Sequence, residues 1–329
     1  MLESSQQTPT NQCLLASSSS EPSAAYLLPL RRWFADELGD LPSYLAELPD
    51  DIDVIVADGS ADQIFNEHAR RLPIRVSHIR VQITGGAVNG KAAAVVTAMR
   101  AIALERIVIA DDDVRYDNDS LRAVLCALDS ADVIRPQNFF SPMPWHAAWD
   151  SSRSLVNRVL GGDWPGTLAI NRSAYLRAGG YATDVLFENF ELVRAVRKSG
   201  GRERLANNIF VRRLPASLAR FREQRVRQAY DEFARPGRLA FFLALWPAAA
   251  VTFAFWGPGP VILASVTAIM IAETGRRQAA GVRYFPPVAS LFAPLWVLER
   301  ATCSWIAVWH RVRYGGIAYA GVVLRRAAD

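Results

Sequence analysis

The amino-acid sequence predicts an α/β fold with a mostly parallel sheet, followed by C-terminal membrane helices. Short apolar runs of strand length alternate with segments of helical spacing through the first part of the chain. Strands that alternate with helices indicate a parallel sheet joined by right-handed crossovers. One apolar run, at 107–110, ends in three adjacent aspartates, and the last third of the chain contains longer uncharged runs. These observations predict a ligand site on the sheet and a membrane contact after it.

The predicted elements follow one another closely along the chain. Each predicted strand is a short apolar run, and each predicted helix shows helical spacing or is rich in alanine. The strands are expected at 24–30, 52–57, 74–83 and 107–110. The helices are expected at 41–48, 61–72 and 91–104. No repeat period accompanies them, which argues against a solenoid.

Composition and charge indicate where the chain works. It has 329 residues, a hydrophobic fraction of 51% and a net charge of +5. Residues 1–23 lack the basic and apolar regions of a secretory signal, so we expect a disordered leader before a cytosolic domain. The pairs Arg276-Arg277 and Arg325-Arg326 flank apolar segments. This placement favours an anionic membrane surface as the partner of the basic residues. We expect no nucleic-acid partner.

Asp111, Asp112 and Asp113 directly follow the apolar run at 107–110. Ligands of open α/β sheets collect beyond the carboxyl ends of the strands. Adjacent carboxylates repel one another, so their crowding is costly unless a cation or basic groups balance them. A solvated acidic turn is the common alternative for an isolated acidic run. The preceding strand favours a divalent metal site that carries a diphosphate.

Two further residues are placed to contact a nucleotide. Asp58 follows the predicted strand at 52–57; considered alone it is a helix cap, but with the aspartate cluster it is expected to contact a ribose or base. Residues 85–91 read GGAVNGK, half of a phosphate-binding loop. Ala92 stands where a Walker-type NTPase has its magnesium-binding hydroxyl, which argues against that class. Lys91, at a helix start, is still expected to meet a phosphate.

Together, the motifs resemble those of family 2 glycosyltransferases over roughly residues 24–238, and they occur in the family's order. The resemblance includes membrane-bound members such as ceramide glucosyltransferases and hopanoid-associated relatives. It implies a nucleotide-sugar-binding glycosyltransferase A-type fold. By this resemblance, the D-x-D metal ligands are Asp111 and Asp113. The implied contacts to the nucleotide sugar are Pro29 (the proline after the first strand), Asp58, Lys91, Asp112, Gln224 and Arg227.

Other segments also match the family, with two departures. Gly166, Arg172 and the Gly179-Gly180-Tyr181 step resemble its acceptor-side strand and turn, and residues 224–228 resemble its Q-x-x-R-W motif. Gln228 stands in place of the motif's tryptophan.

The second departure concerns the catalytic base. Glu188-Asn189 stands where many members have Glu-Asp, and Asn189 cannot accept a proton in that role. Glu188 is therefore the predicted base, with Glu191 and Asp184 close in sequence. Glu191 and Arg194 have the i,i+3 spacing of an ordinary helical ion pair, which makes Glu191 the weaker candidate.

The implied chemistry is one displacement at the anomeric carbon of the sugar. The metal, Mg²⁺ or Mn²⁺, would stabilise the charge that grows on the diphosphate leaving group. A carboxylate would deprotonate the acceptor hydroxyl, which attacks from the opposite side and inverts that carbon. Arg227, together with Lys91, is expected to help hold the diphosphate.

The last third of the chain predicts membrane contact. Residues 239–256 are uncharged and just long enough to span a bilayer. A Gly-Pro-Gly-Pro turn and a shorter apolar run follow, so 239–272 predict a hairpin whose flanking arginines keep both ends cytosolic. The stretch 285–309 contains the charged pair Glu299-Arg300, which favours an interfacial or re-entrant element. The sequence is compatible with either two or three crossings of the membrane.

We therefore predict a cytosolic glycosyltransferase domain at 24–237 and a membrane-associated region at 238–329, at the inner (cytoplasmic) membrane. The predicted function is inverting, metal-dependent transfer of a sugar, expected to be a hexose, from a nucleotide-sugar donor to a lipid or lipid-linked acceptor. A processive polysaccharide synthase is a weaker alternative, because it normally needs more spanning helices. A non-catalytic membrane protein that keeps the fold as a binding module is the alternative that Asn189 favours.

Overall fold

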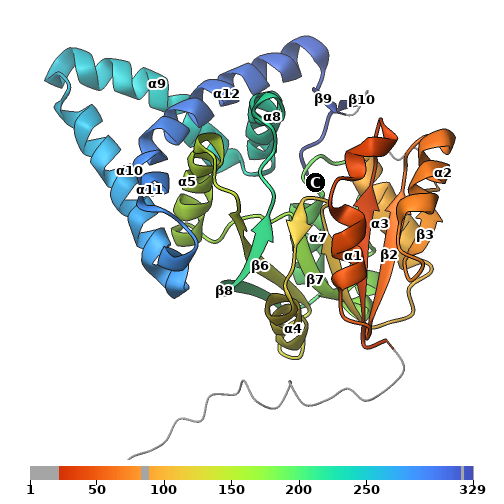
Figure 1. The fold of residues 1–329 in the computed structure, drawn as a ribbon. Helices are drawn as coiled ribbons and strands as arrows, with labels where there is room; N and C mark the ends of the chain where they lie inside the picture. The colour runs from red at the N-terminus through yellow and green to blue at the C-terminus, as the bar shows by residue number, and fades with distance from the viewer. Residues whose placement is uncertain (1–21, 83–88, 320–321, 329) are drawn as a thin grey trace, which may run out of the picture.

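The computed structural model describes residues 22–82, 89–319 and 322–328. The predicted leader at 1–23 lies outside these ranges except for its last two residues, as does most of the glycine-rich segment at 85–91. A central sheet carries helices on both faces, and the helices of the last third of the chain lie together on one side of it (Figure 1).

Within the described ranges, the main sheet has eight strands in the order β3-β2-β1-β4-β7-β6-β8-β5. β3, β2, β1 and β4 are parallel neighbours, and so are β6 and β8. β7 is antiparallel to β4 and β6, and β5 is antiparallel to β8. The sheet is mixed and mostly parallel, as the sequence predicts. The strands are β1 (Ala24–Leu30), β2 (Ile52–Asp58), β3 (Ser77–Arg80), β4 (Arg106–Ala110), β5 (Val114–Arg115), β6 (Val133–Phe140), β7 (Thr167–Asn171) and β8 (Glu203–Arg213).

Helices cover both faces of this sheet. α1 and α4 contribute to the apolar cluster on one face, and α3, α6 and α7 contribute to the cluster on the other. The helices up to the last third of the chain are η3 (Ala35–Leu38), α1 (Leu41–Glu47), α2 (Asp62–Arg71), α3 (Gly90–Met99), α4 (Asn118–Ala127), α5 (Trp145–Val159), α6 (Arg172–Arg177), α7 (Glu188–Lys198) and α8 (Leu218–Tyr230).

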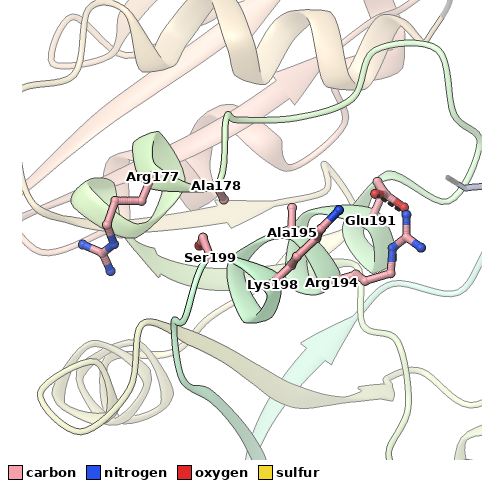
Figure 2. A pocket seen from close by; sticks show the side chains of 7 residues that line it. All are labelled: Arg177, Ala178, Glu191, Arg194, Ala195, Lys198 and Ser199. Atoms are coloured by element: carbon pink, nitrogen blue, oxygen red, sulfur yellow. Dashed lines mark hydrogen bonds and ion pairs between the residues drawn. The ribbon is translucent and has the colours of Figure 1, made fainter.

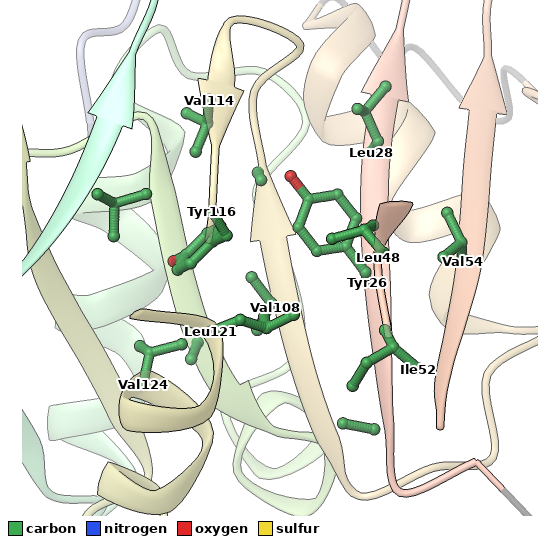
Figure 3. Packing of buried hydrophobic residues seen from close by; sticks show 14 of the residues in the cluster. Tyr26, Leu28, Leu48, Ile52, Val54, Val108, Val114, Tyr116, Leu121 and Val124 are labelled. Atoms are coloured by element: carbon green, nitrogen blue, oxygen red, sulfur yellow. The ribbon is translucent and has the colours of Figure 1, made fainter. Parts of the chain in front are cut away.

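The alternation of side chains along β1 explains how one strand supports two cores. Tyr26 and Leu28 belong to the cluster with α1 and α4, whereas Ala25 and Leu27 belong to the opposite cluster. Successive side chains of a strand point to opposite faces, and a strand buried on both faces is therefore apolar throughout. Figure 3 shows Tyr26 among the side chains of its cluster, between β1 and β4.

The predicted elements exist, but some bounds differ. The strand expected at 74–83 is shorter, because β3 covers only Ser77–Arg80 among the described residues. The helix expected at 91–104 begins one residue earlier, at Gly90, and ends at Met99. Asn89 explains the start, because its side chain accepts hydrogen bonds from the backbone N–H groups of Lys91 and Ala92 as an N-cap.

The last third of the chain forms a helical layer beside α5 and α8 (Figure 1). Among the described residues, one helix, α9, is long and apolar enough to cross a membrane. An apolar cluster that includes Leu155 of α5, Phe242 of α9 and Trp296 of α12 joins this layer to the rest of the fold. Its elements are η4 (Asp231–Ala234), α9 (Pro236–Trp256), α10 (Gly259–Arg277), η5 (Gln278–Arg283), α11 (Pro287–Leu291), α12 (Ala293–Tyr314), β9 (Ile317–Tyr319) and β10 (Val322–Leu324).

Candidate active site

The three predicted strand-end aspartates lie directly after β4, near the middle of the sheet. The backbone N–H of Asp111 donates to the carbonyl of Gly166, 2.8 Å away, directly before the neighbouring β7. A Cβ at Gly166 would lie 2.7 Å from Asp111 Oδ2 and 3.0 Å from the guanidinium carbon of Arg213. A larger residue at this position would therefore displace the carboxylate of Asp111 and the guanidinium of Arg213 from their places beside the backbone.

Three basic side chains balance the aspartates. Lys91 Nζ lies 2.6 Å from Asp111 Oδ1, and Arg32 forms an ion pair with Asp112. Arg213, at the end of β8, places Nε 2.9 Å from Asp113 Oδ2 and Nη2 3.5 Å from Asp111 Oδ2. Of these three, only Lys91 is anticipated by the sequence motifs.

Burial and charge act together on the ionisation of this cluster. Burial raises the pKa of Asp113, and the charges of Asp111 and Asp112 raise it further against the lowering effect of Arg213. Burial disfavours the charged form of Lys91, but Asp111 and Glu188 outweigh it and hold the pKa of Lys91 well above its ordinary value. The ammonium of Lys91 is thus a fixed positive charge in the site.

The aspartates suit a divalent cation bound together with a diphosphate. Asp113 Oδ1 is buried and has no hydrogen-bond partner among the described residues, so it is an acceptor oxygen without a donor. Within the described ranges, no group of three or more His, Cys, Asp or Glu side chains is arranged to hold a metal alone. Asp111 and Asp113 stay the predicted metal ligands; Mg²⁺ is commonly bound by one or two carboxylates together with substrate phosphates.

Glu188, the predicted base, lies in the same charge network. It is the first residue of α7, where the positive end of the helix dipole favours a carboxylate. Its Oε1 lies 2.9 Å from Lys91 Nζ, and its Oε2 accepts a hydrogen bond of 3.3 Å from Asn89 Nδ2. Lys91 therefore bridges Glu188 and Asp111, and the structure brings the predicted base and a predicted metal ligand together.

Asn189 has a structural role in this arrangement. Its Oδ1 accepts a hydrogen bond of 2.7 Å from the Tyr181 hydroxyl, and its Nδ2 donates to the carbonyl of Pro165 at 3.3 Å. The side chain is buried.

The helical ion pair predicted for Glu191 and Arg194 is confirmed, with 2.9 Å between Oε1 and Nη2.

Asp58 is the last residue of β2, which extends one residue beyond the predicted strand, and its side chain is completely buried. Its Oδ1 accepts from the backbone N–H of Ser60 at 2.8 Å, and its Oδ2 contacts His68 Nδ1 at 2.7 Å and His78 Nε2 at 3.1 Å. Although burial disfavours the charge, these hydrogen bonds hold the pKa of Asp58 well below its usual range. Asp58 therefore stabilises its own turn, and its contact with a nucleotide stays a prediction.

The remaining predicted contacts lie on β1 and α8. Pro29 is buried inside β1, opposite Ala57 of β2, and the strand continues one residue beyond it. Gln224 and Arg227 lie on α8, and the charge of Arg227 acts on Asp231, which follows that helix. Their roles at a nucleotide sugar stay predictions. Gln228 accepts a hydrogen bond from Arg225 of its own helix.

Asp231 is a candidate functional residue that the motifs do not indicate. Burial raises its pKa to about 7, against the lowering effects of Arg227, Arg300 and Arg235, and the charge of Glu188 raises it further. Carboxylates with such strongly raised pKa values cluster at functional sites. The only sequence signal is its place just after the segment that resembles Q-x-x-R-W.

The end of the chain packs against the segment that leads into Glu188. The backbone N–H groups of Leu186 and Phe187 donate to the carbonyls of Arg326 and Ala327 at 3.0 and 2.8 Å. The Tyr230 hydroxyl donates to the carbonyl of Arg325 at 2.8 Å. The C-terminal tail thereby ties α8 to the start of α7.

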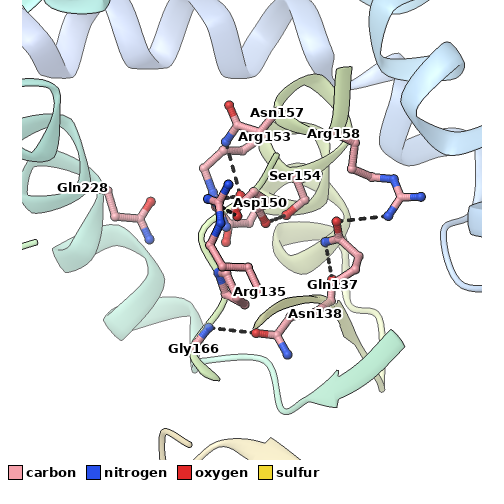
Figure 4. A network of polar contacts seen from close by, with 12 residues as sticks. Arg135, Gln137, Asn138, Asp150, Arg153, Ser154, Asn157, Arg158, Gly166 and Gln228 are labelled. Carbon is pink, nitrogen blue, oxygen red and sulfur yellow. Dashed lines mark hydrogen bonds and ion pairs between the residues drawn. The ribbon is translucent and has the colours of Figure 1, made fainter. Parts of the chain in front are cut away.

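A buried polar network connects the sheet to α5 and α8 (Figure 4). Asp150 of α5 accepts from Arg225 of α8 at 2.8 Å, and Arg225 Nε lies 3.2 Å from Glu299 of α12. Figure 4 also shows Asn138 accepting a hydrogen bond of 2.8 Å from the backbone N–H of Gly166. The network thereby connects Gly166, whose carbonyl accepts from the backbone of Asp111, with helix α8.

Two surface hollows are lined by residues other than the strand-end aspartates and Glu188. The first has a volume of about 360 Å³, and Figure 2 shows side chains of α6 and α7 around it, among them Arg177, Arg194 and Lys198. Arg177 pairs with Asp132 and Arg194 with Glu191, so the structure already balances these charges. The second, of about 450 Å³, is lined by Arg135, Gly161, Arg197, Gly201, Glu203 and Leu205.

Comparison with known proteins supports the fold. No protein-family model matches the chain, and no curated protein matches it. Among solved structures, the chain is similar to the mannosyltransferase PcManGT from Pyrobaculum calidifontis in complex with GDP-Man and Mn²⁺. The two share 18% sequence identity and a TM-score of 0.55, over 87% of each chain. The predicted fold class is thereby confirmed: an α/β fold with a mostly parallel sheet, shared with a glycosyltransferase.

Proposed function

We propose that this protein transfers a sugar from a nucleotide-sugar donor to a lipid or lipid-linked acceptor at the inner (cytoplasmic) membrane, with its catalytic domain in the cytosol. The observation that supports this best is the bridge of Lys91 between Asp111 and Glu188, at 2.6 and 2.9 Å. It brings a carboxylate for a cation and a carboxylate for proton transfer into one network. The similarity to a protein solved with GDP-Man and Mn²⁺ agrees with this donor class.

Some of the proposed site residues act on the leaving diphosphate, and Glu188 acts on the acceptor hydroxyl. Asp111 and Asp113 would hold Mg²⁺ or Mn²⁺, which when bound supplies positive charge to the diphosphate as it leaves. Lys91, which carries a positive charge, would share the diphosphate with Arg227. Glu188 accepts the proton of the acceptor hydroxyl, and attack from the face opposite the diphosphate inverts the anomeric carbon.

The helical layer supports the proposal of a membrane acceptor. Large apolar side chains are exposed along α9 and α10, among them Phe253, Trp256 and Leu263. Glu299 of α12 faces inward, because its Oε2 accepts a hydrogen bond of 2.5 Å from Trp149 Nε1 of α5. A Glu299 carboxylate that α12 turns to the globular domain suits the predicted interfacial position of this helix.

The identity of donor and acceptor can be tested directly. Purified protein is incubated with a panel of hexose nucleotides and a total lipid extract, with and without Mn²⁺, and the lipid product is identified by mass spectrometry. One added hexose per lipid is the expected result. A ladder of products would indicate processive synthesis, and donors left intact with every lipid would contradict the proposal.

A non-catalytic binding module is the second candidate, and Asn189 is the observation that favours it. Asn189 is hydrogen-bonded to Tyr181 and Pro165. If the protein only binds the nucleotide sugar, calorimetry will detect donor binding that depends on Asp111, while no nucleoside diphosphate is released. Release of nucleoside diphosphate by the wild-type protein, and its loss in Glu188→Gln, excludes this candidate.

A further inference from the structure

The helical hairpin formed by α9 and α10 is attached to the globular domain for about half of its length. On α10, a Cβ at Gly275 would lie 2.0 Å from the carbonyl oxygen of Leu155, so this turn packs directly on α5. Arg158 of α5 donates to the carbonyls of Gly275 and Gln278 at 2.8 and 2.7 Å. Ala272 is completely buried. The second half of α10 is therefore packed against protein.

The first half of α9 is attached in the same way. Phe242 is buried in the cluster that includes Trp296 of α12. Trp305 Nε1 donates to the carbonyl of Leu243 at 3.2 Å, and Trp246 Nε1 donates to the Thr302 hydroxyl at 3.0 Å. α12 thus lies along α9 as far as Trp246.

The distal part of the hairpin, residues 247–267, has the surface of a lipid-facing segment. It contains no Asp, Glu, Lys or Arg. Its exposed large apolar side chains are Val251, Phe253, Phe255, Trp256, Val261, Ile262, Leu263 and Val266.

The side-chain hydroxyls of this segment are bonded within their own helices. The hydroxyls of Thr252, Ser265 and Thr267 donate to the carbonyls four residues earlier, at 2.8 to 2.9 Å. At the turn, the N–H of Gly257 donates to Phe253, and Pro258 and Pro260 carry no N–H. A turn inside hydrocarbon must leave few donors without partners. The turn at 257–260 meets much of this requirement.

The length of residues 247–267 decides how far the hairpin can reach. α9 continues for ten residues beyond Trp246, and α10 has nine residues before Ala268, where packing on the globular domain begins. At 1.5 Å per residue, these segments extend about 15 and 14 Å. The hydrocarbon core of a bilayer is about 30 Å thick. Residues 247–267 can therefore reach about halfway through the hydrocarbon core of the bilayer.

We propose that residues 247–267 insert into only the leaflet that faces the globular domain and do not cross the membrane. Arg277 and Arg283, both exposed, follow the packed half of α10, on the side away from the tip of this wedge, which is residues 247–267. The wedge would hold the site at a fixed height above the bilayer. This inference rests on the membrane association in the proposed function and adds its depth and topology.

The test uses the full-length protein in sealed vesicles of phosphatidylcholine and phosphatidylglycerol. Pro258→Cys and Ala254→Cys, each in a background without the native cysteines, carry a fluorophore near the tip; the second reporter leaves the Gly-Pro turn intact. We expect stronger quenching by nitroxides near the bilayer centre than by headgroup nitroxides. We also expect neither cysteine to react with an impermeant thiol reagent on either side of the membrane.

Reaction of either cysteine from the side opposite the globular domain would overturn the wedge, as would quenching by headgroup nitroxides alone. Phe255→Asp should abolish sedimentation with vesicles, whereas Ile74→Asp, at a fully exposed apolar position of the globular domain, should leave it unchanged. Wild-type protein that fails to sediment would overturn both the wedge and the membrane association. If the protein sediments with the vesicles but a tip cysteine reacts on the side opposite the globular domain, only the wedge would be overturned.

Discussion

At the scale of single residues, Lys91 organises the candidate site. Its ammonium contacts Asp111 and Glu188 at the same time, and a cation bound at Asp111 would compete for the same carboxylate oxygen. Asp111 and Asp113 are the residues proposed to hold that cation. Because Lys91 also contacts Glu188, we expect donor binding to change the electrostatic environment of the proposed base.

Replacement of Glu188 by Gln tests the assignment of the base. The substitution should lower turnover by roughly 10²–10⁴-fold, the usual cost of losing a general base, while donor binding measured by calorimetry survives. Asn189→Asp introduces the acid that the resemblance to family 2 glycosyltransferases implies for this position, so it shows whether the position supports catalysis when ionisable.

Glu191→Gln is the matched control, because Glu191 pairs with Arg194 on α7. It should change turnover little. A large loss with Glu191→Gln and a small one with Glu188→Gln would move the base to Glu191.

Asp231 predicts a pH dependence of stability. Its pKa is about 7 in the folded protein, above the ordinary value of 3.8, so the folded state favours the protonated form. The stability that this preference contributes is complete below about pH 4 and is lost as the pH rises to 7. Asp231→Asn should therefore raise Tm relative to wild type increasingly from pH 4 to pH 7, with a constant difference above. Asp119→Asn, on the exposed start of α4, serves as control; an equal difference at every pH would refute the assignment.

The sequence anticipates the residues of the site better than their partners. The aspartates after β4 and Lys91 at the start of α3 belong to local motifs, so their positions follow from the strand and helix beside them. Arg213 reaches Asp113 from a strand one hundred residues later. His68 and His78 reach Asp58 from α2 and β3. Such partners depend on strand order, which local patterns do not contain.

At the scale of elements, the C-terminal tail should position the base. Its carbonyls accept hydrogen bonds from Leu186 and Phe187, directly before Glu188. Deletion of residues 325–329 should lower turnover by roughly 10- to 100-fold through misplacement of Glu188, with donor binding preserved. Steady-state kinetics and calorimetry on the same preparation measure both quantities.

Arg326→Ala is the matched control for the deletion. It removes the half-exposed ion pair with Asp184, of 2.6 Å, but keeps the backbone hydrogen bonds of the tail. An exposed ion pair contributes about 0–1 kcal/mol, so turnover should change by only a few-fold. Equal losses in both variants would show that the tail acts through this ion pair.

Strands and helices with strong periodicity could be predicted, whereas their exact ends could not. β1 agrees with its predicted range because it is apolar throughout and ends in Arg31-Arg32. β3 is shorter than its predicted range because it pairs only with the last part of β2, from Ile55 to Asp58. The extent of an outer strand depends on its neighbour rather than on its own composition.

At the scale of the whole molecule, the two ends of the helical layer should share one side of the membrane. The layer packs on α5 at Gly275 and returns to α7 through the tail. Cysteines at Ala279 and Ala328, in a background without native cysteines, should both be shielded from an impermeant thiol reagent in intact cells. Both should react after permeabilisation. Labelling of Ala328→Cys but not Ala279→Cys in intact cells would mean that α12 crosses the membrane.

The central claim is that Asp111 and Asp113 hold the divalent cation that carries the diphosphate of the donor. The most direct measurement is the rate of nucleoside diphosphate release by purified protein, after chelation and after Mn²⁺ is restored, for wild type, Asp111→Asn and Asp113→Asn. Wild-type activity should disappear with chelation and return with Mn²⁺. Both variants should lose at least about 10²-fold in rate, with weaker donor binding and an unchanged fold. Near-full activity of either variant without added metal would contradict the claim.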